Sequence, residues 1–280
     1  MTALKMSVES RTWEIAGADG AALMVHSWLP RGGGDWAIVA IHGATSHAGW
    51  FAPLGRALAR RGIATHAPDR RGSGRLRQLE LPAAPEVWID DLMRVVKAVR
   101  ARGSRVCLAP WSFAVKLGVP AIQSGCEVDH LLLLAPAFVF TAKVAGTLAS
   151  GVAAAGSHAP LPAADEDFVE GSAARAFLAA DALRWRTMPK AFRMLSDRLN
   201  LMMRAQLPQL DMPVTGVFAS RDRIADSDGG REILAELGHT ALSIEGGHSF
   251  FLDDPEQAAD LIRQVLSERE PDAGGRRPET

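Results

Sequence analysis

Short apolar runs alternate with longer helical patterns along most of the chain. This alternation predicts an α/β fold in which helices cover both faces of a mostly parallel sheet. The expected buried strands are Trp36–Ile41, Ile63–Ala67, Arg105–Ala109, Val128–Leu134, Pro213–Ala219 and Ala241–Ile244. The expected helices cover Phe51–Arg61, Glu86–Arg102, the residues after Ser112 to about Ser124, Gly230–Leu237 and Pro255–Glu268. Two earlier runs, Arg11–Ile15 and Ala21–Leu29, predict an opening hairpin, so the sheet should have about eight strands.

The regular alternation stops between Phe140 and Met212, where no strand-like run occurs. Residues 1–139 and 212–270 are therefore expected to form the core, residues 140–211 an inserted helical lid, and residues 271–280 a disordered tail. Within the lid, an apolar stripe at helical spacing predicts packing on the core or a wall of the substrate pocket. This stripe consists of Met188, Phe192, Leu195, Leu199 and Met202.

Composition narrows the possible partners. Of 280 residues, 48% are hydrophobic and 22% charged, as in a soluble globular enzyme. The 31 basic residues nearly balance the 32 acidic ones, so no positive field indicates nucleic acid. No apolar run is long enough to span a membrane, and acidic residues stand where a signal peptide would be apolar. We expect a cytoplasmic protein with a small-molecule substrate, and nothing indicates an oligomeric state. The two cysteines, Cys107 and Cys126, are interpreted as reduced thiols without metal-ligand spacing.

Three polar residues follow predicted strands in an order typical of serine hydrolases. Ser112 lies between a strand and a helix, Asp222 follows Pro213–Ala219, and His248 follows the last strand. A serine hydroxyl is a weak nucleophile that needs a base, a group orienting that base, and donors for the developing oxyanion. Each of the three residues alone would more often be structural, but the chain order serine, acid, histidine matches a nucleophile-elbow motif.

Two further motifs stand between the same elements. His42-Gly43-Ala44-Thr45 follows one strand, and the run from Asp69 to Gly74 follows the next. With the three polar residues, these motifs resemble the α/β-hydrolase superfamily from about Trp36 to Leu266, particularly the branch containing monoacylglycerol lipases and lysophospholipase-like enzymes. The resemblance implies a serine hydrolase that cleaves a carboxylic ester with an apolar acyl group, monoglyceride-like or small, through an acyl-enzyme. Such chemistry needs no metal or organic cofactor.

The resemblance also implies roles for individual residues. The backbone N–H groups of Ala44 and Phe113 would form the oxyanion hole, and His42 and Gly43 would support their loop. Pocket-lining side chains are expected at Trp111, Met188 and Phe192. The family pattern has glycine two residues on either side of the serine, and this chain instead has Pro110 and Ala114.

Several alternatives remain open from the sequence. The same triad could serve an acyl thioesterase acting on a CoA or carrier-bound substrate, or an enzyme that cleaves carbon–carbon bonds. Because Pro110 departs from the family pattern, a non-catalytic binding protein is a further alternative. Asp226 and Asp228 compete with Asp222 for the role of the acid. The arginine cluster Arg70, Arg71, Arg75 and Arg77 is interpreted as a solvated loop rather than an anion site.

Overall fold

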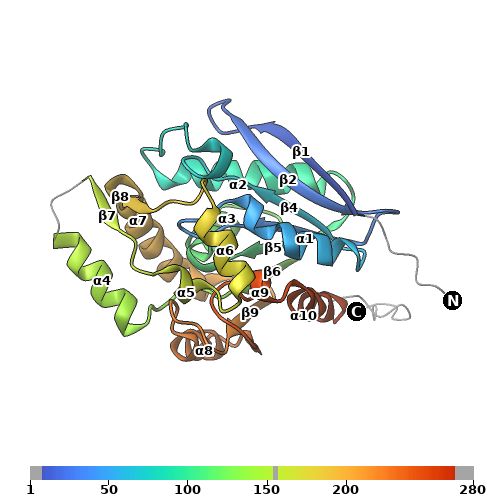
Figure 1. Ribbon diagram of the computed structural model, residues 1–280. Coiled ribbons are helices and arrows are strands. Elements are labelled where there is room, and N and C mark those ends of the chain that lie inside the picture. Colours follow the sequence, from blue (N-terminus) through green and yellow to red (C-terminus); the bar gives the residue numbers. More distant parts are fainter. Residues whose placement is uncertain (1–7, 154–156, 269–280) are drawn as a thin grey trace.

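The computed structural model describes residues 8–153 and 157–268. Its central feature is an eight-stranded sheet in the order β1-β2-β4-β3-β5-β6-β9-β10 (Figure 1). β1 pairs antiparallel with β2 and β2 with β4, whereas the remaining neighbours are parallel. The predicted mostly parallel eight-stranded sheet is thus confirmed. The strands are β1 (Val8–Ala16), β2 (Ala22–Pro30), β3 (Trp36–Ile41), β4 (Ala64–Pro68), β5 (Arg105–Pro110), β6 (His130–Leu134), β9 (Val214–Ala219) and β10 (Thr240–Ile244).

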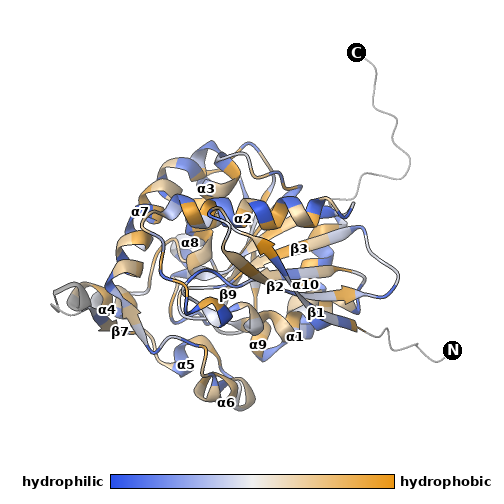
Figure 2. Cartoon of the chain, turned by 90° about the horizontal axis from the view of Figure 1, so that it is seen from above, coloured by the Kyte–Doolittle hydropathy of each residue, from blue (hydrophilic) through white to orange (hydrophobic). Residues whose placement is uncertain are grey.

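Helices cover both faces of the sheet, with α1 and α10 opposite α2 and α3 (Figure 2). The helices of the core are α1 (Ala52–Ala59), α2 (Pro85–Arg100), α3 (Val115–Gln123), α8 (Ser227–Glu236), α9 (Phe250–Asp253) and α10 (Pro255–Ser267). Each begins or ends within a few residues of its predicted position, except the short α9, which the sequence pattern did not indicate. The α/β class is therefore confirmed.

The central strand β3 shows why its sequence is apolar throughout. All six of its residues are buried, because alternate side chains of a parallel strand face opposite helical layers. One set packs with α1 and α10, namely Trp36, Ile38 and Ala40. The other set packs with α2 and α3, namely Ala37, Val39 and Ile41. The sheet thus lies between two apolar cores.

Between β6 and β9 the chain leaves the sheet and forms a peripheral layer, drawn in green to brown at the left and centre of Figure 1. This layer contains α4 (Ala142–Ala153), β7 (His158–Pro160), α5 (Asp165–Phe168), α6 (Ser172–Ala180), β8 (Thr187–Pro189) and α7 (Lys190–Gln206). The expectation that residues 140–212 hold no strand is wrong, since β7 and β8 pair antiparallel. Each is only three residues long, too short to produce an alternating pattern.

The predicted tail, 271–280, lies outside the described residues. In the part of the chain that the structure describes, no helix is both long and apolar enough to cross a membrane.

Candidate active site

Ser112 occupies a sharp turn at the end of β5, where a 3₁₀ turn over Ser112–Ala114 leads into α3. Its φ of 57° lies in the left-handed region, which is unfavourable for a residue with a side chain. The turn is held from two sides, because Trp111 N–H donates to Ile41 O (2.9 Å) and Ala137 N–H donates to Ser112 O (3.4 Å). The residue is only 8% exposed.

The structure brings Ser112, His248 and Asp222 together. His248 Nε2 lies 2.7 Å from Ser112 Oγ, and His248 Nδ1 lies 2.7 Å from Asp222 Oδ2. Asp222 Oδ1 in turn accepts the backbone N–H groups of Ile224 (2.8 Å) and Ala225 (2.9 Å). The side chains of His248 and Asp222 are 0% and 1% exposed, so this chain of hydrogen bonds is shielded from water.

The hydrogen bonds define the tautomer of His248. Because an ionised carboxylate can only accept, Nδ1 carries the proton and donates it to Asp222. Nε2 then presents its lone pair to the Ser112 hydroxyl. Trp111 Nε1 donates to His248 O (3.1 Å), which fixes the histidine backbone as well.

The competing acids are engaged elsewhere. Asp226 accepts Gly229 N–H (3.2 Å) as the N-terminal cap of α8, and Asp228 pairs with Arg231. Among the hydrogen bonds of the described residues, neither of these carboxylates is joined to His248, whereas Asp222 is.

His42 lies in the loop after β3 and is fully buried. Its Nε2 accepts Arg70 N–H (3.0 Å), so Nδ1 carries the proton and donates to Gly43 O (2.9 Å). Burial and, next, the charge of Arg70 lower the pKa of His42 to about 3. An imidazole that is neutral near neutral pH and has both nitrogens engaged suits support of the loop rather than proton transfer.

Arg70 contradicts the expectation of a solvated arginine loop. Its guanidinium is buried and donates to the carbonyl oxygens of His42 (3.3 Å), Gly43 (3.4 Å) and Ala44 (3.1 Å). It also lies 5.0 Å from the ring centroid of Phe113. One side chain therefore braces both segments whose N–H groups were expected to form the oxyanion hole. Arg71 is likewise buried and pairs with Asp91 (2.6 Å), whereas the expectation of exposure holds for Arg75 and Arg77.

Two glycines explain how the loop and the elbow fit together. A Cβ on Gly43 would lie 3.1 Å from the Trp111 ring and 3.5 Å from Ser112 Cβ. A Cβ on Gly118, one turn into α3, would lie 3.0 Å from Pro110 Cγ. The proline that departs from the family pattern is thus accommodated because a glycine faces it.

A cavity of about 170 Å³ opens onto Ser112 and His248. Its wall is largely apolar, with side chains from the core and from the layer between β6 and β9. Trp111, Met188 and Phe192 line this cavity together with Phe113. Leu195 and Leu199, further along the stripe of α7, are buried in the core. Part of the stripe thus lines the cavity and part packs on the core, and a role in substrate binding stays a prediction.

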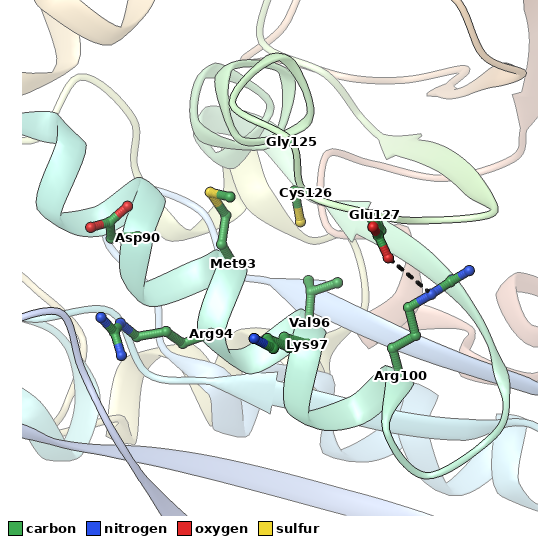
Figure 3. A pocket seen from close by; sticks show the side chains of 9 residues that line it. All are labelled: Asp90, Met93, Arg94, Val96, Lys97, Arg100, Gly125, Cys126 and Glu127. Atoms are coloured by element: carbon green, nitrogen blue, oxygen red, sulfur yellow. Dashed lines mark ion pairs between the residues drawn. The ribbon is translucent and has the colours of Figure 1, made fainter.

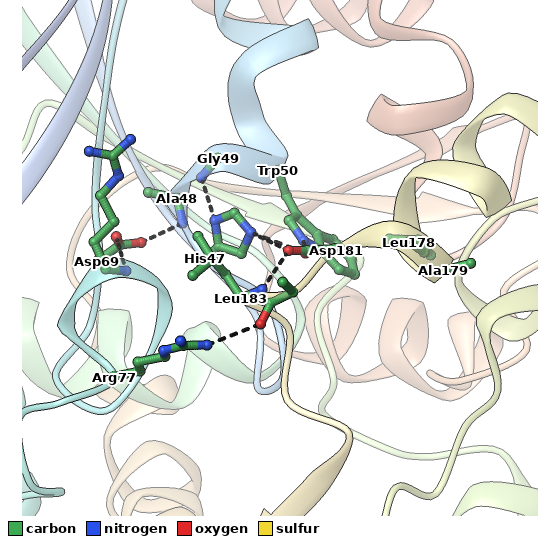
Figure 4. Close-up of polar contacts among 12 residues, drawn as sticks. His47, Ala48, Gly49, Trp50, Asp69, Arg77, Leu178, Ala179, Asp181 and Leu183 are labelled. Carbon is green, nitrogen blue, oxygen red and sulfur yellow. Dashed lines mark hydrogen bonds and ion pairs between the residues drawn. The ribbon is translucent and has the colours of Figure 1, made fainter.

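Polar contacts missed by sequence reasoning tie the peripheral layer to the loop after β3 (Figure 4). Asp181 accepts His47 Nε2–H (3.0 Å), Trp50 Nε1–H (2.8 Å) and Leu183 N–H (2.9 Å). Burial alone would raise the pKa of Asp181, but the hydrogen bonds from His47 and Trp50 lower it to about 2. Because more than 130 residues separate His47 from Asp181, only a signal linking distant positions could have paired them.

A second hollow lies on the surface between α2 and the loop at Gly125–Glu127 (Figure 3). Its volume is about 500 Å³, and charged side chains such as Arg94, Lys97 and Glu127 line it. The ion pair of Arg100 with Glu127 (3.6 Å) crosses one end. None of its lining residues belongs to the hydrogen-bonded chain at Ser112, so this hollow lacks the groups that the chemistry requires.

The fold and this constellation define a hydrolase of the α/β-hydrolase type. A family model described as Serine aminopeptidase, S33 (Hydrolase_4) matches residues 34–254. Because the match covers most of the chain, the protein belongs to this family. No curated protein matched the sequence.

Solved structures share the fold. A soluble variant of monoglyceride lipase from Saccharomyces cerevisiae, in complex with a substrate analog, is similar with a TM-score of 0.74 and 16% identity, covering 96% of this chain and 97% of that one. A monoacylglycerol lipase from Paleococcus ferrophilus gives a TM-score of 0.67 at 15% identity, covering 94% and 100%. The thioesterase domain from the curacin biosynthetic pathway gives 0.63 at 17% identity, covering 92% and 99%. At these identities the likeness establishes the fold alone.

Proposed function

We propose that the protein hydrolyses a carboxylic ester, with Ser112 as nucleophile, His248 as general base and acid, and Asp222 orienting His248. The observation that carries the proposal is the chain of two 2.7 Å hydrogen bonds from Ser112 through His248 to Asp222 at an apolar cavity. Such a geometry places a base within reach of the hydroxyl proton and an ionised group behind the base.

In the first step, Ser112 Oγ attacks the ester carbonyl carbon while its proton passes to His248 Nε2. The resulting oxyanion is stabilised by the N–H groups of Ala44 and Phe113. Arg70 contacts both residues, through Ala44 O and the ring of Phe113. His248 then gives the proton to the departing alcohol, leaving an acyl-enzyme. Water, deprotonated by His248, attacks this ester and releases the acid and the free Ser112 hydroxyl.

The cavity supports a compact substrate. Pockets for drug-sized ligands measure roughly 300–1,000 Å³, and this one, at about 170 Å³, is smaller. Among the expected substrates, a small ester with a short apolar acyl group fits this space better than a long-chain monoglyceride. We propose that residues 140–211 act as a lid over this space, because Met188, Phe192 and Phe168 from that segment line the cavity.

A thioesterase is the second candidate, favoured by the likeness to the curacin thioesterase domain. A thioester would use the same three residues and differ only in its leaving group. The description of the matching family also names an aminopeptidase, so an amide substrate is included in the same assay.

Parallel assays of a 4-nitrophenyl ester, an acyl-CoA and an aminoacyl nitroanilide test the proposal. We expect the ester to give the highest kcat/KM and Ser112→Ala to abolish its turnover. Ser104→Ala, at the opposite end of β5, is the matched serine control and should retain wild-type activity. A higher kcat/KM for the acyl-CoA would assign the thioesterase, and an inactive wild-type protein would favour a binding protein.

A further inference from the structure

The cavity contains one charged group that the proposed mechanism does not use. Lys116 follows the nucleophile by four residues and lies on α3, whose other buried residues are apolar or glycine. It lines the cavity together with Ser112 and His248, yet it is only 5% exposed. Sequence offered one signal for it, a single charge within the apolar run FAVKLGVPAI.

Lys116 has no partner that explains its burial. Among the described residues, no hydrogen bond or ion pair joins its ammonium to a carboxylate. The ammonium instead lies 5.4 Å from the ring centroid of Phe140. Asp197 on α7 exerts an attraction on Lys116 and Arg204 a repulsion, but neither forms an ion pair with it. Burying an ammonium without a paired anion costs free energy. A ligand that brings an anion into the cavity beside Ser112 would offset this cost.

The remaining polar side chains of the cavity do not already supply that anion. Arg193, Ser196 and Asp197 come from one face of α7 and also line the cavity. Asp197 is exposed to solvent, and it attracts Lys116 without forming an ion pair with it among the described residues. The cavity lining therefore contains a carboxylate that is not paired with the buried ammonium.

Burial lowers the pKa of Lys116 to about 8. Near neutral pH the side chain therefore still carries its proton in most molecules. It can donate charge-assisted hydrogen bonds to an acceptor in the cavity.

We propose that Lys116 binds a carboxylate at the end of the substrate remote from the reacting carbonyl. This inference rests on the ester-hydrolase function proposed above and specifies its substrate class as esters that carry a free acid group. The acid group belongs either to the acyl portion, as in a monoester of a short dicarboxylic acid, or to the alcohol portion.

Two matched substrate pairs distinguish these sources. Mono-4-nitrophenyl glutarate is compared with 4-nitrophenyl pentanoate, which has the same chain without the carboxylate, and 4-carboxyphenyl butyrate is compared with phenyl butyrate. In one pair we expect kcat/KM to favour the carboxylate by about tenfold to a hundredfold, the range of a charge-assisted hydrogen bond. Lys116→Met, similar in length but uncharged, should abolish this preference mainly through KM, and Lys116→Arg should retain part of it. Lys97→Met, which removes an exposed lysine of α2, is the control for overall charge and should leave the ratio within about twofold.

The proposal is overturned if neither pair favours the carboxylate, or if Lys116→Met leaves the ratio unchanged. If both neutral esters are hydrolysed and the carboxylate esters are not preferred, only the role of Lys116 is refuted. If no ester is hydrolysed, the proposed function itself is refuted. In the latter case calorimetric titration of the Ser112→Ala variant with mono-4-nitrophenyl glutarate and 4-nitrophenyl pentanoate still tests Lys116. Binding must favour the glutarate and lose that preference in the Lys116→Met double variant.

Discussion

Asp222→Asn separates the orienting role of this residue from its place in the fold. Oδ1 of Asp222 accepts two backbone N–H groups, at 2.8 and 2.9 Å. An asparagine must keep its carbonyl oxygen there, because the opposite orientation would place an NH₂ against two donors and cost about 1–3 kcal/mol for each lost buried hydrogen bond. The new NH₂ group therefore faces His248 Nδ1.

This orientation imposes the wrong tautomer on His248. Nδ1 must now accept, so Nε2 carries the proton and can no longer take one from Ser112. The imidazolium that forms during attack also loses a carboxylate in direct contact, worth about 4 kcal/mol at an effective dielectric constant near 20. The change of tautomer adds about 1 kcal/mol to the activation free energy. Together the two effects should lower kcat/KM by roughly 10³- to 10⁴-fold.

The assay compares kcat/KM on a 4-nitrophenyl ester with the melting temperature of each variant. The melting temperature of Asp222→Asn should stay close to that of the wild type, because both backbone hydrogen bonds to Oδ1 remain. Asp226→Asn makes the same chemical change four residues away, in a helix cap where Asn and Asp are about equally good, and should retain activity. This expectation is refuted if Asp222→Asn and Asp226→Asn both keep more than about a tenth of the wild-type kcat/KM.

Three other changes test supporting contacts. Arg70→Met should lower kcat about tenfold or more with little change in KM, because Ala44 O loses its 3.1 Å hydrogen bond from the guanidinium. If Arg70→Lys had the wild-type kcat, the forked guanidinium would not be needed. Gly118→Ala should stabilise the protein by about 1 kcal/mol in the Pro110→Gly background but not in the wild type, because the added Cβ lies 3.0 Å from the Pro110 ring. Equal changes in the free energy of urea unfolding in both backgrounds would exclude coupling between positions 110 and 118. Asp181 has a folded pKa of about 2 against an ordinary 3.8, so its contribution to stability is present above pH 4 and is lost as pH falls toward 2. The stability deficit of Asp181→Asn should therefore shrink between pH 7 and pH 3 in urea unfolding, and a deficit that stays constant would count against this linkage.

Local pattern predicted most of the fold. The central strands are buried on both faces, so their apolar runs mark them with little ambiguity, and β3 has the expected bounds. The strands β7 and β8 escaped prediction because each is three residues long and exists only through its pairing with the other. Their stability comes from partners distant in sequence, which a local pattern does not contain.

The candidate site divides in the same way. Chain order, together with the motifs at His42–Thr45 and Asp69–Gly74, pointed to Ser112, Asp222 and His248. The residues that follow parallel strands lie close together because those strands end at the same edge of the sheet. The burial of Arg70 could not be foreseen, since the carbonyl oxygens and aromatic rings that surround it come from the loop after β3, the elbow, α2 and α7. Pro110 departs from the family pattern, and Gly118, eight residues later, leaves room for its ring, a pairing that the local sequence does not indicate.

Identification of the residue that forms the covalent intermediate tests the central claim most directly. The native protein is treated with a fluorophosphonate, digested, and analysed by mass spectrometry, in parallel with Ser112→Ala and Ser104→Ala. We predict a single phosphonate adduct on Ser112 in the native protein and in Ser104→Ala, and no adduct in Ser112→Ala. Undiminished labelling of Ser112→Ala, or an adduct on another serine of the native protein, would contradict the assignment of Ser112 as the nucleophile.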